Sequence, residues 1–245
     1  MDRRSALLFA WASMLAACGG GGGGGAVVST PPSGASGVQP APAPSPTPAP
    51  TPAPAPPGMS PDIVAWGDSM TPAFALNLQV LYPGRTVLQE GFLGQTSTVI
   101  ANNEVADADH HNWINIFWYG HNNENDPETI KADIARSIAQ LAPGNSRFIV
   151  LGVVNEANGK EGKGTPAYGK IVTLNADLAA LYPGNYIDIR AWLVAHYNAN
   201  DAGDVADFQD DVPPRSLRYD EIHLRNEGSV LVAERVKQFI DAKGW

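Results

Sequence analysis

Short apolar runs alternate with longer amphipathic segments through residues 58–245. The runs are rich in β-branched residues, which is typical of strands, whereas the segments place apolar residues three or four positions apart, which is typical of helices. We expect strands at residues 62–66, 86–89, 113–118, 147–154 and 186–189. We expect helices at residues 72–82, 127–141, 168–182 and 226–243. Strands that alternate with helices favour a parallel sheet covered by helices.

A Pro-Gly pair recurs at residues 83–84, 143–144 and 183–184, each time between a predicted helix and a predicted strand. Proline and glycine just beyond a helix end the helix and turn the chain. This repetition predicts a three-layer α/β/α sandwich with a five-stranded, mainly parallel sheet and right-handed connections. In such a sheet, ligands bind at the loops that follow the carboxyl ends of the strands.

The helices are predicted from their apolar rows, which are more typical of a core than of a binding site. Asp126 is expected to cap the helix of residues 127–141, because Pro127 suits the first helical position. One row, in the helix of residues 168–182, consists of Ile171, Leu174, Leu178 and Leu181.

Residues 1–18 differ in character from the rest of the chain. Arg3 and Arg4 precede an apolar stretch that is long enough for a signal peptide and too short to span a bilayer. It ends Leu15-Ala16-Ala17-Cys18, which resembles the lipobox of bacterial lipoproteins. The resemblance implies cleavage before Cys18 and lipidation of this cysteine. A plain secretory signal with an incidental cysteine is the alternative.

Residues 19–57 are expected to form a disordered tether between that leader and one globular domain at residues 58–245. A glycine run fills residues 19–25, and residues 40–57 alternate proline with small residues. The proline segment favours extended polyproline II at about 3.1 Å per residue, a reach of roughly 50 Å. By resemblance to Gram-negative lipoproteins, Gly19 after the cysteine implies the outer membrane. We therefore expect a lipid-anchored protein of the cell envelope, facing the periplasm or the surface.

Charge and cysteine content exclude several classes of function. The formal net charge is −9 and no basic patch appears, which argues against nucleic-acid binding. The single cysteine excludes an intrachain disulfide and a cysteine-based zinc site. His110 and His111 follow Asp107 and Asp109, but they lack a recognised ligand spacing, so a polar loop is favoured over a metal site. The polar run at residues 122–126 does not fit the EF-hand spacing. We expect no metal and no cofactor.

Four short blocks follow predicted strands or precede the last helix, where ligands are expected. They are Gly67-Asp68-Ser69, the glycine-rich turn at residues 91–97, Gly120-His121-Asn122-Asn123 and Asp220-Glu221-Ile222-His223. In this order they resemble the blocks of the SGNH (GDSL-type) hydrolase family, over about residues 62–240. The resemblance implies the family's flavodoxin-like α/β/α fold and a serine esterase. Two positions depart from the family pattern, since Asn123 stands where aspartate is common and Met70 where leucine is common.

Acyl transfer needs a nucleophile, a base, a group that orients the base, and donors for the oxyanion. Both this chemistry and the resemblance assign Ser69 as nucleophile, His223 as general base and Asp220 as its orienting carboxylate. The backbone N–H groups of Ser69 and Gly94 and the side-chain amide of Asn122 are expected to receive the oxyanion.

Each block also has a simpler interpretation when it is taken alone. Gly-Asp-Ser can be a helix cap, and Asp220 and His223 can be a turn residue and a surface residue. Gly94 can serve only as a turn glycine with positive φ, and Asn122 can cap its loop. His121 can contact substrate or can be an ordinary loop residue.

The loops around the blocks favour a short-chain substrate. The loop of residues 159–165 is polar and expected to be flexible, and the expected loop of residues 198–217 is acidic, so neither resembles an apolar lid. Aromatic residues near the blocks can stack on sugars or pack in the core; they are Trp66, Phe92, Trp118 and Tyr119.

These observations lead us to expect an esterase acting on a small-molecule or glycan ester, and specifically a carbohydrate O-deacetylase. We expect a monomer whose membrane contact is made only through the lipid. A lipase or thioesterase, an O-acyltransferase of the same family and a non-enzymatic envelope-binding lipoprotein are the alternatives.

Overall fold

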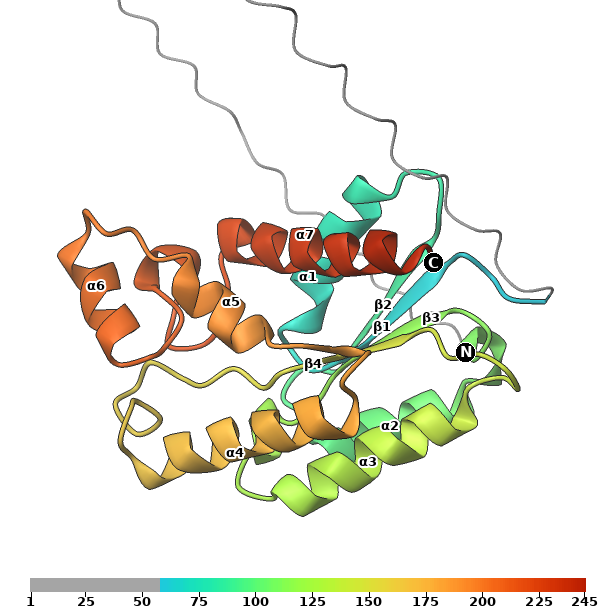
Figure 1. Cartoon of the computed structure of the whole chain (residues 1–245), viewed down its shortest axis with the longest axis horizontal. Helices are drawn as coiled ribbons and strands as arrows, with labels where there is room; N and C mark the ends of the chain where they lie inside the picture. Colours follow the sequence, from blue (N-terminus) through green and yellow to red (C-terminus); the bar gives the residue numbers. More distant parts are fainter. Residues whose placement is uncertain (1–57) are drawn as a thin grey trace, which may run out of the picture. The chain divides into compact units, whose positions relative to one another are not determined.

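The computed structural model describes residues 58–245 (Figure 1). The predicted signal peptide at residues 1–18, its lipidation site Cys18 and the predicted tether at residues 19–57 lie outside the described residues. Within residues 58–245, none of the helices combines the length and the apolarity that a membrane span requires.

Five parallel strands form one sheet in the order β2-β1-β3-β4-β5. The strands are β1 (Ile63–Gly67), β2 (Val87–Gly91), β3 (Ile114–Trp118), β4 (Phe148–Leu151) and β5 (Tyr186–Ile187). Every residue of β1 and of β3 is buried, because helices cover both faces of the central strands. The predicted five-stranded sheet is therefore confirmed.

The helices form two layers, one on each face of the sheet (Figure 1). One layer contains α1 (Thr71–Leu81), α5 (Ile189–Ala195) and α7 (Asn226–Lys243), with α6 (Ala202–Gln209) beside α5. The other layer contains α2 (Ser97–Ala106), α3 (Pro127–Gln140) and α4 (Pro166–Leu181). Short 3₁₀ turns lie at Ala108–His110, His121–Asn123 and Arg215–Leu217.

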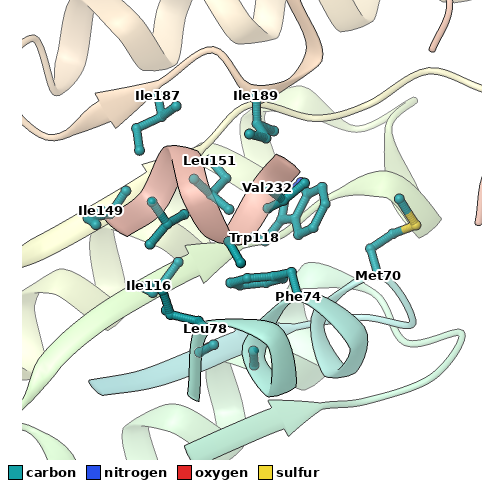
Figure 2. Close-up of a cluster of buried hydrophobic side chains, with 14 of the residues drawn as sticks. Met70, Phe74, Leu78, Ile116, Trp118, Ile149, Leu151, Ile187, Ile189 and Val232 are labelled. Atoms are coloured by element: carbon teal, nitrogen blue, oxygen red, sulfur yellow. The ribbon is translucent and has the colours of Figure 1, made fainter. Parts of the chain in front are cut away.

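Alternate residues of the strands supply the cores of the two layers. In β1, Ile63 and Ala65 pack on the α1 and α7 side, whereas Val64 and Trp66 pack on the α2 and α3 side. In the first core, the rings of Phe74 and Trp118 meet edge to face with centroids 5.4 Å apart (Figure 2). Successive side chains of a strand point to opposite faces, and because both faces are buried the sequence shows a continuous apolar run.

Most predicted elements are present, with shifted ends. Residues 226–243 form α7 as predicted, and the Asp126 carboxylate accepts a hydrogen bond of 3.4 Å from the Thr129 amide at the start of α3, so the predicted cap is confirmed. In the predicted row of α4, Leu181 is exposed and does not belong to the core, although the other three members are buried.

The fourth strand is shorter than the predicted range of 147–154. Beyond its end at Leu151, the backbone of Val153 hydrogen-bonds to a side chain of α4 and not to a neighbouring strand. The side-chain amide of Asn175 accepts from the Val153 N–H at 2.7 Å and donates to the Val153 carbonyl at 2.8 Å. The fifth strand also ends early, because the Asp188 carboxylate accepts from the Ala191 N–H and begins α5.

Three helices were not predicted from the pattern. In α2 only Ile100 and Ala101 supply buried apolar side chains, which is too few for a recognisable period. The prediction of a loop at residues 198–217 is wrong, because this segment contains the helix α6. Two of the acidic residues that argued against an apolar lid, Asp204 and Asp207, are buried in the protein.

Candidate active site

Ser69 lies in a tight turn between the end of β1 and the start of α1. Gly67 allows this turn, because a Cβ atom there would lie 2.1 Å from the Thr71 Oγ1 atom and 2.7 Å from the Trp118 carbonyl oxygen. The buried Asp68 carboxylate accepts a 3.0 Å hydrogen bond from the Met70 N–H, and its carbonyl accepts from Thr71 at 3.2 Å. The turn is therefore fixed by packing and by its own backbone. Met70 occupies the N-cap position of α1, and neither Asp68 nor Ser69 takes that role.

Burial raises the pKa of Asp68 above its usual value, although the Met70 N–H and the nearby His121 and His223 oppose this effect. The carboxylate faces away from water and into the base of the turn. Asp68 therefore supports the shape of the loop that presents Ser69.

His223 bridges the other two residues of the predicted triad. Its Nε2 atom lies 2.9 Å from the Ser69 hydroxyl, and its Nδ1 atom lies 2.7 Å from the Asp220 carboxylate. A carboxylate can only accept, so Nδ1 carries the proton and Nε2 is free to accept from Ser69. The structure thus brings together three residues that are separated by up to 154 positions in the sequence. The surface-residue interpretation of His223 and Asp220 does not account for this arrangement.

Asp220 also fixes the backbone of its own loop. Its second carboxylate oxygen accepts from the Ile222 N–H at 2.9 Å and from the His223 N–H at 2.7 Å. Partial burial raises the pKa of Asp220, but these N–H donors and the His223 ring outweigh it, so the pKa lies below its usual value. An ionised Asp220 can stabilise a protonated His223.

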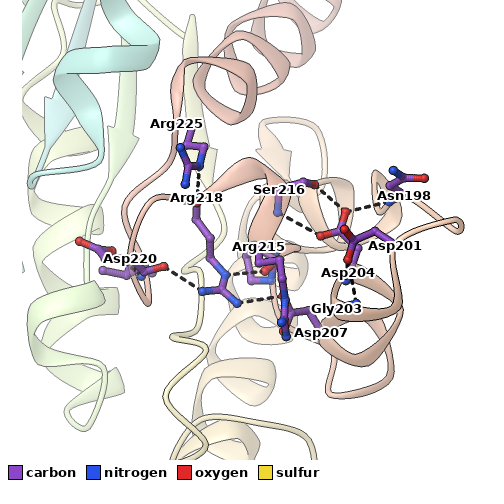
Figure 3. A network of polar contacts seen from close by, with 12 residues as sticks. Asn198, Asp201, Gly203, Asp204, Asp207, Arg215, Ser216, Arg218, Asp220 and Arg225 are labelled. Carbon is purple, nitrogen blue, oxygen red and sulfur yellow. Dashed lines mark hydrogen bonds and ion pairs between the residues drawn. The ribbon is translucent and has the colours of Figure 1, made fainter.

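Arg218 anchors the loop of Asp220 to α6 (Figure 3). Its guanidinium donates to the Asp220 carbonyl at 2.8 Å, to the Pro213 carbonyl at 2.9 Å and to the buried Asp207 carboxylate at 2.9 Å. Asp207 is also bound by Arg215. Sequence reasoning missed Arg218 and Asp207, and no local signal marks them, because they are 11 positions apart and meet only through the fold.

Two of the three predicted oxyanion residues, Gly94 and Asn122, lie on two loops that are tied together. Gly94 has a φ of +70°, so its turn-glycine role is present whatever else it does. The Asn122 side-chain amide donates to the Gln95 carbonyl at 3.0 Å, which joins the loop after β2 to the loop after β3. Asn122 and Gly94 are both exposed residues.

Asn123, which departs from the family pattern, supports the same junction. Its side-chain oxygen accepts from the Ser97 N–H at 2.9 Å, and its amide donates to the Ser97 hydroxyl at 3.0 Å. The Ser97 hydroxyl donates in turn to Asp133 at 2.7 Å, so it needs a donor as its other partner. Asparagine supplies that donor and an ionised aspartate cannot.

His121 is bound on both sides of its ring. Nδ1 lies 3.2 Å from the Val154 carbonyl, and Nε2 lies 3.2 Å from the Glu156 carboxylate. These contacts tether the Asn122 loop to the segment after β4, which fits the ordinary loop role better than a substrate contact. The neighbouring loop of residues 159–165 is less free than expected, because the buried Glu161 carboxylate accepts from the Glu156 N–H at 2.7 Å.

The aromatic residues near the blocks belong mainly to the core. Trp66, Trp118 and Tyr119 are buried, and Phe92 is half-buried against the core of the α2 layer. The exposed apolar side chains at the site are instead Leu93, beside Gly94, and Tyr219, beside Asp220.

The two adjacent histidines bind separate acids. His110 lies 2.8 Å from the Asp107 carboxylate, and His111 Nε2 lies 3.0 Å from the Glu104 main-chain carbonyl and 3.3 Å from its carboxylate. Within residues 58–245, no group of three or more histidine, cysteine or acidic side chains is placed to hold a metal ion.

The described residues also form two cavities away from the triad. One of about 390 Å³ lies between α3 and α4, and one of about 180 Å³ lies between α4 and the region of β5. No residue of the predicted triad or of the predicted oxyanion site lines either of them.

No family model matches the chain. Among solved structures, it is similar to a GDSL-like lipase from Bacteroides thetaiotaomicron, with 17% identity, a TM-score of 0.56 and coverage of 74% of this chain and 88% of the other. A catalytic mutant of an acetylxylan esterase from Geobacillus stearothermophilus has 14% identity and a TM-score of 0.54, with coverage of 75% and 95%. The catalytic domain of peptidoglycan O-acetyltransferase A from Streptococcus pneumoniae has 16% identity and a TM-score of 0.51, with coverage of 76% and 96%.

One curated protein matches in sequence over a short stretch. The tail spike protein of Salmonella phage epsilon15 is 34% identical over 98 residues, which cover 35% of this chain and 9% of the tail spike. The structural similarities, at low identity, establish the fold: the chain has the α/β/α fold of the SGNH (GDSL-type) hydrolases.

Proposed function

We propose that this chain, built on the SGNH hydrolase fold, is a serine esterase that removes short acyl groups, in particular acetyl groups, from carbohydrates. The observation that carries this proposal is the pair of hydrogen bonds that joins the Ser69 hydroxyl to His223 and His223 to Asp220. Such a chain of contacts activates a serine for attack on a carbonyl group.

The reaction follows from this geometry. The Ser69 oxygen attacks the ester carbonyl while His223 Nε2 takes the hydroxyl proton. The tetrahedral oxyanion is received by the backbone N–H groups of Ser69 and Gly94 and by the Asn122 amide. The bond to the alcohol then breaks, and His223 returns its proton to the departing oxygen. Water, activated by His223, hydrolyses the acyl-enzyme and regenerates Ser69.

The openness of the site supports a substrate in which the ester is a small group on a larger molecule. The side chains of His223 and Asp220 are 32% and 43% exposed. The names of two proteins of similar fold refer to acetyl groups on glycans: an acetylxylan esterase and a peptidoglycan O-acetyltransferase. A glycan bearing O-acetyl groups fits both observations.

We also propose that the enzyme works at the cell envelope. The support is the lipobox-like end at Cys18 and the glycine- and proline-rich segment after it. An anchored esterase with such a tether would reach envelope polysaccharides. Detergent partitioning of the protein from cells, compared with Cys18→Ser, tests this proposal, since the variant should lose its membrane fraction.

The proposed activity is tested with p-nitrophenyl acetate and p-nitrophenyl octanoate, using the purified protein and Ser69→Ala. We expect turnover of the acetate and loss of that activity in the variant by at least about 10⁴-fold. A clear preference for octanoate would replace the short-chain proposal with a lipase or thioesterase. Equal rates for the wild type and the variant on both esters would contradict a serine esterase.

Transfer of the acyl group to a sugar hydroxyl is the second candidate. The exposure of His223 favours it, because an acceptor alcohol can reach the acyl-enzyme by the same route as water. Product analysis by mass spectrometry with an added oligosaccharide separates the two reactions: an acetylated acceptor indicates transfer, and free acetate alone indicates hydrolysis.

A further inference from the structure

Tyr219 is an exposed aromatic residue placed directly beside the proposed general base. Its side chain is 62% exposed, although it immediately precedes Asp220. The phenol ring lies nearly parallel to the His223 imidazole, with an interplanar angle of 11° and centroids 5.6 Å apart. The rings are therefore parallel and offset, and most of the phenol remains open to solvent.

The position of this ring is set by the backbone. The Tyr219 N–H donates to the His223 carbonyl at 3.0 Å, and the flanking residues Arg218 and Leu224 form an antiparallel bridge. Tyr219 belongs to neither hydrophobic core of the described residues. Its large apolar surface is therefore held in place at the site without contributing to the packing of the fold.

The proposed reaction decides which half of the substrate meets this ring. The carbonyl oxygen of the ester must face Gly94 and Asn122. The oxygen of the alcohol must face His223 Nε2, because it receives the proton from that atom. A ring beside the imidazole is therefore next to the alcohol half of the ester, whereas Leu93 lies on the loop of the oxyanion site.

We infer that Tyr219 forms a subsite for the leaving group and determines specificity by stacking on a sugar ring of the alcohol. This inference rests on the proposed esterase function. The apolar C–H face of a pyranose matches the open face of an aromatic ring, while the sugar hydroxyls stay in water. Asp220 and the exposed Glu221 beside it disfavour an anionic alcohol such as a phosphorylated one. A long alkyl alcohol would need an extended apolar surface, and Tyr219 has acidic neighbours on its C-terminal side.

The test compares two kinds of acetyl ester that differ in the alcohol. β-D-glucose pentaacetate and acetylated xylo-oligosaccharides present a pyranose, and ethyl acetate presents no ring. For Tyr219→Ala we expect kcat/KM on the sugar acetates to fall roughly 3- to 10-fold, mainly through KM, with ethyl acetate unchanged. Tyr219→Phe keeps the ring and should keep the preference. Phe208→Ala removes an exposed aromatic side chain from α6 and is the matched control, with no change on either ester.

Three results would overturn the inference. Equal losses on both kinds of ester, with a shifted pH profile of kcat, would mean that Tyr219 only positions His223. If Tyr219→Ala loses no activity on either ester, the ring has no role in the reaction. If the wild type does not prefer sugar acetates over ethyl acetate, there is no subsite for a sugar. If the wild type and Ser69→Ala are equally inactive on every ester, the proposed esterase function fails, which is distinguishable from failure at Tyr219 alone.

Discussion

Residues 67–71, which carry Ser69, and residues 218–224, which carry Asp220 and His223, are held by different forces. The first loop is closed by packing, since Gly67 has no room for a side chain and Asp68 is buried. The second loop combines an exposed tip at Tyr219, Asp220 and Glu221 with buried Ile222 and Leu224, and polar contacts from Arg218 hold its exposed part. The nucleophile loop therefore depends mainly on packing, whereas the base loop also depends on a polar anchor.

The largest effect is expected when the exposed loop loses its base. His223→Ala should lower kcat/KM by about 10⁴-fold or more, because Ser69 then has no acceptor for its proton. The melting temperature should stay close to that of the wild type, since the imidazole is 32% exposed and lies outside both cores. Kinetics on p-nitrophenyl acetate with parallel thermal unfolding measures both. A large loss of stability in His223→Ala would mean that the contact of His223 with Ser69 also stabilises the fold.

Asn122→Ala tests the loop after β3, which the Asn122 amide joins to the loop after β2. We expect kcat to fall about 10²–10³-fold, because one donor to the oxyanion is lost. The loop should keep its conformation, since Asn123 still bonds to Ser97. Asn125→Ala, on the same segment and exposed, is the control and should be near wild type. If Asn122→Ala has a normal kcat, Asn122 does not donate to the oxyanion, and its role is only the contact with Gln95.

Arg218→Met removes the polar anchor of the base loop. The loss of a charged donor to the Asp220 carbonyl should cost about 1.5–3 kcal/mol, seen as a kcat/KM roughly 10- to 100-fold lower. Arg215→Met is the matched control, because the Arg215 guanidinium binds the same Asp207 carboxylate and, within the described part of the chain, donates to that group alone. It should lose stability with little change in kcat. Partial rescue by Arg218→Lys would support positioning, and equal kinetics for the two methionine variants would contradict it.

Gly67→Ala acts on the packed loop. The added Cβ atom would clash with Thr71 and with the Trp118 carbonyl, so we expect a loss of about 1–3 kcal/mol in the free energy of unfolding. Gly84→Ala is the control, because a methyl group at this position would meet no described atom within 4 Å. Urea unfolding measures the difference. If Gly67→Ala leaves the free energy of unfolding unchanged, the Ser69 loop can shift to accept the methyl group despite its close packing.

The smallest effect on the site is expected from Glu104, which is fully buried in α2. Burial raises its pKa to about 7, so it takes up a proton on folding at mildly acidic pH. The contribution of Glu104 to stability should therefore be greatest at acidic pH, fall as pH rises from about 4.5 to 7, and then level off. Glu104→Gln should flatten this dependence without changing kcat, as measured by urea unfolding at pH 5, 6, 7 and 8. The exposed Glu234→Gln is the control, and a curve for Glu104→Gln parallel to the wild type would assign the dependence elsewhere.

Much of the fold could be predicted because it depends on local periodicity. The strands near Ile63 and Ile114 are short apolar runs, and the helix Asn226–Lys243 repeats its apolar residues with the period of a helix. The α6 helix could not be predicted in this way, because its buried side chains include the carboxylates of Asp204 and Asp207. Their partners, among them Ser216 and Arg218, come from residues beyond the helix.

The five strands, four of the helices and the four blocks at the strand ends could be read from local pattern, since turn chemistry and periodicity act over a few residues. The burial of the aromatic residues, the ends of the strands and the contacts that hold the base depend on the tertiary structure. It buries Trp66, Trp118 and Tyr119 and leaves Tyr219 exposed beside His223. Burial and ion pairing depend on what packs against a residue, and that partner is supplied by segments far away in the chain.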